Sequence, residues 1–268
     1  MVVFGLFIVV LLLSYLLLIA FFYVFQESFL FQAKSMNRDE AFEFDFPFEE
    51  RNVKMEDGAV INTVMLRATN AKGVMLYFHG NSGDLTRWAP IANAFTEYGF
   101  DVLVFDYRGY GKSRGHRSMQ RLYRDGLVLY ESLLESYRED DIVIYGRSIG
   151  TSMATWLAAR TKAQQLLLET PFYQISEVLA FRFLMLPASL LLKYPFSNAK
   201  YMGSVSSPIH IVHGTLDGVV PYFSGKKLYQ AFRDQKVISF TTINGGRHNN
   251  LIQFPEFRRW IEERLVRL

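Results

Sequence analysis

Ser148 is the residue of this sequence whose surroundings most clearly suggest chemistry. It lies in Gly-Arg-Ser-Ile-Gly, residues 146–150, after a run of strand-forming residues and before a predicted helix. A G-x-S-x-G turn between a strand and a helix exposes the serine hydroxyl at a sharp bend. A loop serine can also be a simple turn former or helix cap. The flanking strand and helix favour a nucleophile here.

A nucleophilic serine needs a base to take its proton and an acid to orient that base. Where this motif occurs, the chain order is serine, acid, histidine. Of the five histidines only His248 follows both Ser148 and Asp217, and it lies in a glycine-rich loop between the last predicted strand and the last predicted helix. A loop histidine can be a solvated surface residue, but order and placement favour His248 as the base.

Asp217 is the favoured acid because it follows the fifth predicted strand, in His-Gly-Thr-Leu-Asp, next to the strand that leads to His248. It could instead cap the turn or the helix that starts near Pro221. Glu169, at the end of the preceding strand, is the competing acid. The expected role of the acid is to set the imidazole tautomer and stabilise the imidazolium.

Two backbone N–H groups would complete such a site by binding the oxyanion of the reaction. Ile149 directly follows the serine, and Asn81 ends the His-Gly-Asn that follows the first predicted strand. That tripeptide could be an ordinary turn. Its expected position opposite Ser148 favours Asn81 as the second donor.

Alternating strands and helices must position these residues. The predicted strands are 73–79, 101–107, 141–146, 165–169, 208–214 and 236–243. The predicted helices are 84–98, 118–137, 149–161, 222–233 and 255–267. This alternation predicts a mostly parallel sheet with helices on both faces. Ligands of such sheets bind beyond the carboxyl ends of the strands, where the candidate residues fall.

Composition narrows the function further. The chain has 268 residues, 50% of them hydrophobic, which suits one globular domain plus an extra segment. The net charge of +3 comes from scattered basic residues, so a nucleic-acid partner is not expected. The sequence contains no cysteine. No metal or organic cofactor is expected either, because neither ligand spacing nor a dinucleotide fingerprint occurs.

The extra segment is residues 1–26, which carry no charged side chain and exceed the roughly 20 residues that a helix needs to span a bilayer. A cleaved signal peptide is the alternative, but the basic start and the small-residue cleavage site are missing. Lys34, Arg38 and Arg51 follow the span, so the positive-inside rule places the rest of the chain in the cytoplasm. We expect a single-pass anchor, a juxtamembrane linker at 27–50 and a catalytic domain at 51–268.

A second apolar run, 183–192, is free of charge and too short to span a bilayer. It could be an ordinary buried helix. We favour a helical lid, about 172–205, that offers an acyl chain a route to Ser148. The expected lid residues are Phe183, Leu184 and Leu191.

Residues 51–268 resemble the α/β hydrolases, and among them the BEM46-like membrane-anchored serine hydrolases. The resemblance rests on YFHGN, FDYRGYGKS, YGRSIG, HGTLDGVVP and GGRHNN, in that order. It implies an eight-stranded hydrolase sheet and esterase, lipase or thioesterase chemistry on lipids or acylated proteins. The alternatives are a non-catalytic binding or scaffold protein and a peptidase on the same fold.

Overall fold

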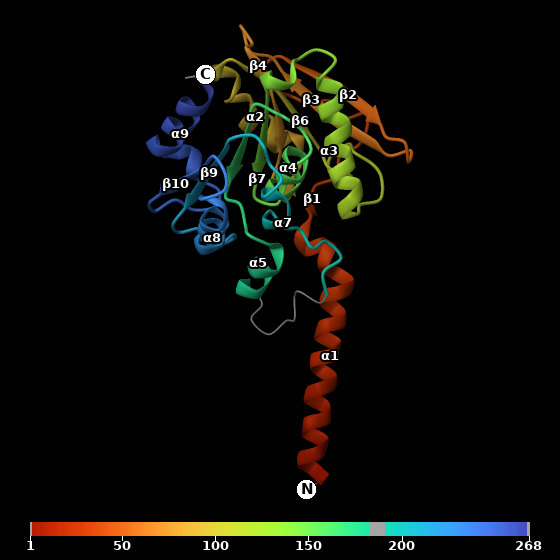
Figure 1. Cartoon of the computed structure of the whole chain (residues 1–268). Coiled ribbons are helices and arrows are strands. Elements are labelled where there is room, and N and C mark those ends of the chain that lie inside the picture. The colour runs from red at the N-terminus through yellow and green to blue at the C-terminus, as the bar shows by residue number, and fades with distance from the viewer. Residues whose placement is uncertain (1, 183–190, 267–268) are drawn as a thin grey trace.

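A computed structural model describes residues 2–182 and 191–266. Its centre is an eight-stranded sheet with the strand order β10-β9-β8-β7-β4-β6-β3-β2 (Figure 1). The strands of this sheet are β2 (Phe48–Lys54), β3 (Val60–Leu66), β4 (Gly73–Phe78), β6 (Phe100–Phe105), β7 (Ile142–Arg147), β8 (Gln165–Glu169), β9 (Ile209–Gly214) and β10 (Ile238–Ile243). All neighbours from β10 to β6 are parallel, while β3 is antiparallel to both β6 and β2.

Helices cover both faces of the sheet. The long helices of the domain are α2 (Leu85–Asn93), α3 (Met119–Leu133), α4 (Gly150–Ala158), α8 (Tyr222–Phe232) and α9 (Pro255–Leu265), with short 3-10 turns at Thr96–Tyr98, Glu139–Asp141 and Leu251–Gln253. Helices α2 and α9 pack in one hydrophobic core, and α3, α4 and α8 pack in the core on the opposite face. The predicted fold class is therefore confirmed.

The central strands show why the sequence pattern was informative. In β4 the side chains of Val74 and Leu76 enter one core, while those of Met75 and Tyr77 enter the other, and all are fully buried. A strand buried on both faces needs a continuous apolar run, which is what the sequence shows. All six predicted strands are present. Strands β2 and β3 were not predicted, because β2 is a polar edge strand and Asn62 and Thr63 interrupt the apolar run of β3.

Helix α1 (Val2–Leu30) projects from the domain as a long, largely exposed rod (Figure 1). Within the described part of the chain it alone is long and apolar enough to cross a membrane, with a mean hydropathy of 3.0. It continues four residues beyond the predicted end at residue 26. Its last turns meet the domain, where Gln26 donates to the Leu191 carbonyl at 3.1 Å and accepts from the Lys193 N–H at 2.7 Å.

The chain after α1 runs along the domain. Residues Gln32–Ala33 (β1) pair in parallel with Ser82–Gly83 (β5), and Phe31, Met36 and Phe42 are buried. The segment expected to be a linker therefore makes many contacts with the domain. The domain boundaries stay predictions.

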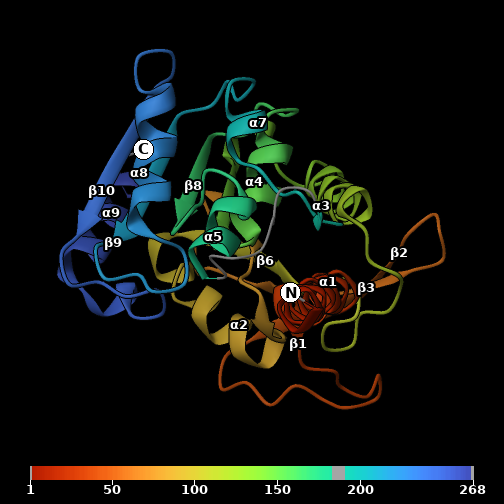
Figure 2. The same ribbon diagram turned by 90° about the horizontal axis from the view of Figure 1, so that it is seen from below.

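Between β8 and β9 the chain forms an insertion with helices α5 (Ile175–Arg182) and α7 (Ala199–Met202). From below, α5 lies beside the axis of α1 and in front of the sheet (Figure 2). Of the expected lid residues, Phe183 and Leu184 lie outside the described residues. Leu191 is half-buried and touches α1 through its carbonyl.

Candidate active site

Ser148 lies at the tight turn between β7 and α4, and its φ of 54° places a non-glycine residue in the left-handed region. Close packing explains the two glycines of the motif. A Cβ at Gly146 would lie 2.7 Å from the Cβ of Ala154, and one at Gly150 would collide with the Phe78 carbonyl. The turn can form only if both positions lack a side chain.

Ser148, Asp217 and His248 come together at the carboxyl ends of β7, β9 and β10. His248 Nε2 lies 3.0 Å from Ser148 Oγ, and His248 Nδ1 lies 2.7 Å from Asp217 Oδ2. All three residues are buried, with exposed fractions of 6%, 6% and 8%. The carboxylate partner assigns the proton to Nδ1, so Nε2 can accept from the serine hydroxyl.

The loop after β9 stabilises the ionised form of the Asp217 carboxyl. Its Oδ1 accepts the N–H groups of Val219 and Val220 at 2.8 and 2.9 Å. Burial by itself would raise the pKa of the Asp217 carboxyl, but hydrogen bonds from His213 and His248 outweigh it and hold the pKa well below its usual range. The group facing His248 is therefore a carboxylate.

His213 was not singled out from the sequence, yet its Nε2 lies 3.4 Å from Asp217 Oδ2 and 3.0 Å from the Val220 carbonyl. It is fully buried on β9, four residues before the acid. It was passed over because it precedes the acid in the chain, and chain order tests only for the base.

The competing acid, Glu169, contacts Tyr145 and Arg147 instead of His248. It accepts from the Tyr145 hydroxyl at 2.6 Å and forms a buried ion pair with Arg147 at 3.4 Å. Arg147 in turn donates to the backbone carbonyl of His248 at 3.2 Å. Glu169 and Arg147 thus support the loop that carries His248. The signal in the sequence for this role of Arg147 was its position directly before Ser148.

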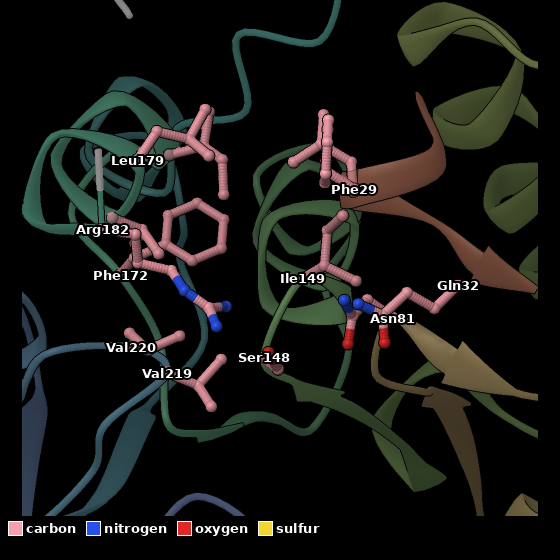
Figure 3. Close-up of a pocket in the computed structure, with 13 residues that line it drawn as sticks. Phe29, Gln32, Asn81, Ser148, Ile149, Phe172, Leu179, Arg182, Val219 and Val220 are labelled. Carbon is pink, nitrogen blue, oxygen red and sulfur yellow. The ribbon is translucent and has the colours of Figure 1, made fainter. Parts of the chain in front are cut away.

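Asn81 and Ile149 both lie at the pocket beside Ser148 (Figure 3). The Asn81 carbonyl is held by the Gln32 N–H at 2.8 Å and the Tyr110 hydroxyl at 2.7 Å, which orients this turn. Neither backbone N–H, of Asn81 or of Ile149, donates to another of the described residues. Both are free to bind an anionic oxygen.

A cavity of about 140 Å³ opens at Ser148 (Figure 3). Its apolar lining residues are Phe29, Leu30, Ile149, Phe172, Ile175, Val178, Leu179, Val219 and Val220, and its polar ones are Gln32, Asn81, Ser148 and Arg182. The wall comes from the end of α1, from α5 and from the acid loop. Such a cavity suits an apolar group attached to a small polar one.

Residues 69–201 match the family described as "Serine aminopeptidase, S33". The chain is 31% identical over 224 residues to the lysophosphatidylserine lipase ABHD12 of Rattus norvegicus. This alignment covers 71% of this chain and 55% of the relative. The Gallus gallus protein of the same name is also 31% identical, over 71% of this chain and 57% of its own length. The chain thus spans somewhat over half the length of these relatives.

Among solved structures, an esterase of Pyrococcus furiosus superposes with a TM-score of 0.69 at 16% identity, covering 88% of this chain and 99% of the esterase. At that identity the likeness concerns the fold. Taken with the sequence matches, it shows that this chain belongs to the α/β-hydrolase superfamily.

Proposed function

We propose that this protein is a membrane-anchored serine hydrolase that cleaves acyl esters or thioesters through an acyl-enzyme on Ser148. The observation that carries the proposal is the continuous hydrogen-bonded chain from Ser148 Oγ through His248 to Asp217 at a strained strand–helix turn. A nucleophile, its base and the orienting acid form the arrangement that acyl transfer requires.

In the proposed reaction His248 Nε2 takes the hydroxyl proton as Ser148 Oγ attacks the substrate carbonyl carbon. The N–H groups of Asn81 and Ile149 bind the oxyanion of the tetrahedral intermediate. His248 then gives the proton to the leaving alcohol or thiol. Water, activated by the same histidine, hydrolyses the acyl-enzyme, and Asp217 stabilises the imidazolium in both halves.

The proposed substrates are acyl lipids or acylated proteins at a membrane surface. The relatives are named lysophosphatidylserine lipases, which supports a lipid. The last turn of α1 lines the cavity through Phe29 and Leu30, so the proposed anchor and the reaction site are continuous. Each methylene buried in such a cavity contributes about 0.8 kcal/mol.

An aminopeptidase activity, which the name of the matching family raises, is less well supported. Recognition of a free amino terminus calls for a carboxylate close to the nucleophile. The described residues that line the cavity include no Asp or Glu, and their charged member is Arg182. The pocket suits a neutral or anionic substrate better than a cationic one.

We further propose that the catalytic domain lies on the cytoplasmic side, based on Lys34, Arg38 and Arg51 after the span. Protease protection of intact cells, with a tag on the C-terminus, tests this orientation. Digestion of the tag from outside the cell would place the domain on the other side.

The first test of the function is Ser148→Ala. A fluorophosphonate probe should label the full-length protein in detergent, and this variant should lose both the labelling and ester hydrolysis, by about 10⁶-fold for hydrolysis. Matched circular dichroism spectra of the two proteins would show that the fold is retained. Labelling of the variant at full strength, or on another serine, would refute the proposed nucleophile.

A further inference from the structure

Arg182 is the charged residue among the described residues that line the cavity at Ser148. Within the described residues no acidic group lies in ion-pair range of its guanidinium, whereas Arg147 is paired with Glu169 and Arg108 with Asp57 and Asp125. Arg182 is exposed at the end of α5. Figure 3 shows its side chain directed into the cavity that opens at Ser148.

The cavity therefore presents two chemistries around one nucleophile. Phe29, Ile175 and Leu179 offer apolar surface, and Arg182 offers a charge that this part of the chain leaves unneutralised. A guanidinium presents a rigid fork of N–H donors that matches phosphate oxygens in pairs. A matching ligand carries a chain at one end and an anion at the other, with the scissile bond between them.

We propose that Arg182 binds the phosphate of a lysophospholipid substrate while its acyl chain lies against the apolar wall. Only the glycerol carbons separate the ester from the phosphate in such a lipid, and Ser148 and Arg182 line the same cavity. The inference rests on the proposed hydrolase function and deepens it. It makes Arg182 the residue that selects anionic over neutral acyl glycerols.

Binding is measured first, with ether analogues that no hydrolase can cleave. An alkyl lysophosphatidylglycerol and the matching alkyl glycerol are presented to the full-length protein in neutral detergent micelles at equal mole fraction. Arg182→Gln should weaken binding of the phosphate lipid about tenfold or more, and Arg182→Lys should weaken it less, because lysine keeps the charge but loses the fork. Binding of the neutral lipid should not change with either variant.

The control variant is Lys193→Gln, which removes a positive charge elsewhere in the same insertion. Lys193 Nζ lies over the Tyr23 ring of α1 at 4.8 Å and is not among the lining residues. It should leave both affinities unchanged. An equal loss in Lys193→Gln and Arg182→Gln would mean that general surface charge attracts the lipid, which would overturn the proposal.

Turnover of the cleavable ester lipids is measured in parallel. Arg182→Gln should raise KM for the lysophosphatidylglycerol and leave the monoacylglycerol unaffected. Charge-dependent binding without turnover would refute the hydrolase function and keep the anion site. Turnover and binding that are indifferent to Arg182, or that fall equally for both lipids, would refute the anion site and keep the hydrolase.

Discussion

Asp217 and Glu169 are both buried and both connected to His248, but through different contacts. Asp217 meets the imidazole directly at 2.7 Å. Glu169 instead holds Arg147, whose other contact is the backbone carbonyl of His248. The first carboxylate can act on the tautomer of the base, while the second can act only on the position of its loop.

We therefore expect Asp217→Asn to lower kcat by about 10⁴-fold, because an amide can favour the wrong imidazole tautomer. Glu169→Gln should cost much less, since an amide oxygen can still accept from Tyr145. Steady-state kinetics on a p-nitrophenyl ester, with both variants checked for folding, decides between them. The reverse order of losses would make Glu169 the catalytic acid.

At the scale of elements, the geometry of the site depends on how closely the start of α4 approaches the end of β4. Gly150 starts α4 against the end of β4, where a Cβ would meet the Phe78 and His79 carbonyls. Overpacking of this kind costs about 1–3 kcal/mol when the backbone can shift, and more when it cannot.

Gly150→Ala should accordingly lower the free energy of unfolding by about 3 kcal/mol and abolish probe labelling, because α4 and Ser148 must move together. Gly203→Ala is the matched control, since among the described residues a Cβ there would contact only Phe232, at an ordinary 3.7 Å. Chemical denaturation measures both variants. Equal stability of the two would mean that the backbone around Gly150 can make room for a methyl group without strain.

The end of α1 is a second element with a direct part in the cavity. Phe29→Ala should raise KM for a long-chain ester by about tenfold while sparing acetyl esters, because a large apolar contact with the chain is lost. Leu17→Ala, on the exposed part of the same helix, is the control and should change neither. A uniform effect of Phe29→Ala on both esters would assign it a purely structural role.

At the scale of the whole molecule, one partly buried histidine, His210, contributes a pH dependence to stability. His210 is half-buried on β9, where its Nδ1 lies 2.8 Å from Ser239 Oγ, and burial lowers its pKa to about 4. Between about pH 6.5 and 4 the unfolded chain therefore binds a proton that the folded chain does not. The folded state loses stability as the pH falls through that window.

His210→Gln should remove this dependence. The wild-type protein should lose stability relative to the variant as the pH falls from about 7 to about 4, and the difference should level off below the folded pKa. Denaturation curves of the full-length protein in one detergent across this range provide the measurement. A difference that is constant with pH would show that His210 titrates normally in the fold.

The sequence by itself determined the fold class and the order of the core strands along the chain. It did so because strands buried on both faces require continuous apolar runs, and β4, β6 and β7 have them. It also singled out Ser148 as the candidate nucleophile, since G-x-S-x-G indicates a nucleophile only between a strand and a helix. The polar edge strand β2 has no such run, and it escaped prediction.

Only the tertiary structure decided which side chains meet. Asp217 meets His248, and Glu169 meets Arg147, because neighbouring strands of the sheet bring the loops at their ends together. Even the contact of Asp217 with His213, four residues earlier, depends on how the loop after β9 folds back. Hydrophobic periodicity in the sequence predicts which face of a helix or strand is buried. It does not predict which polar side chain a buried polar group will contact. For the same reason the sequence could not show that the last turn of α1 lines the cavity, because that contact depends on how α1 packs against the loops at the carboxyl ends of the strands.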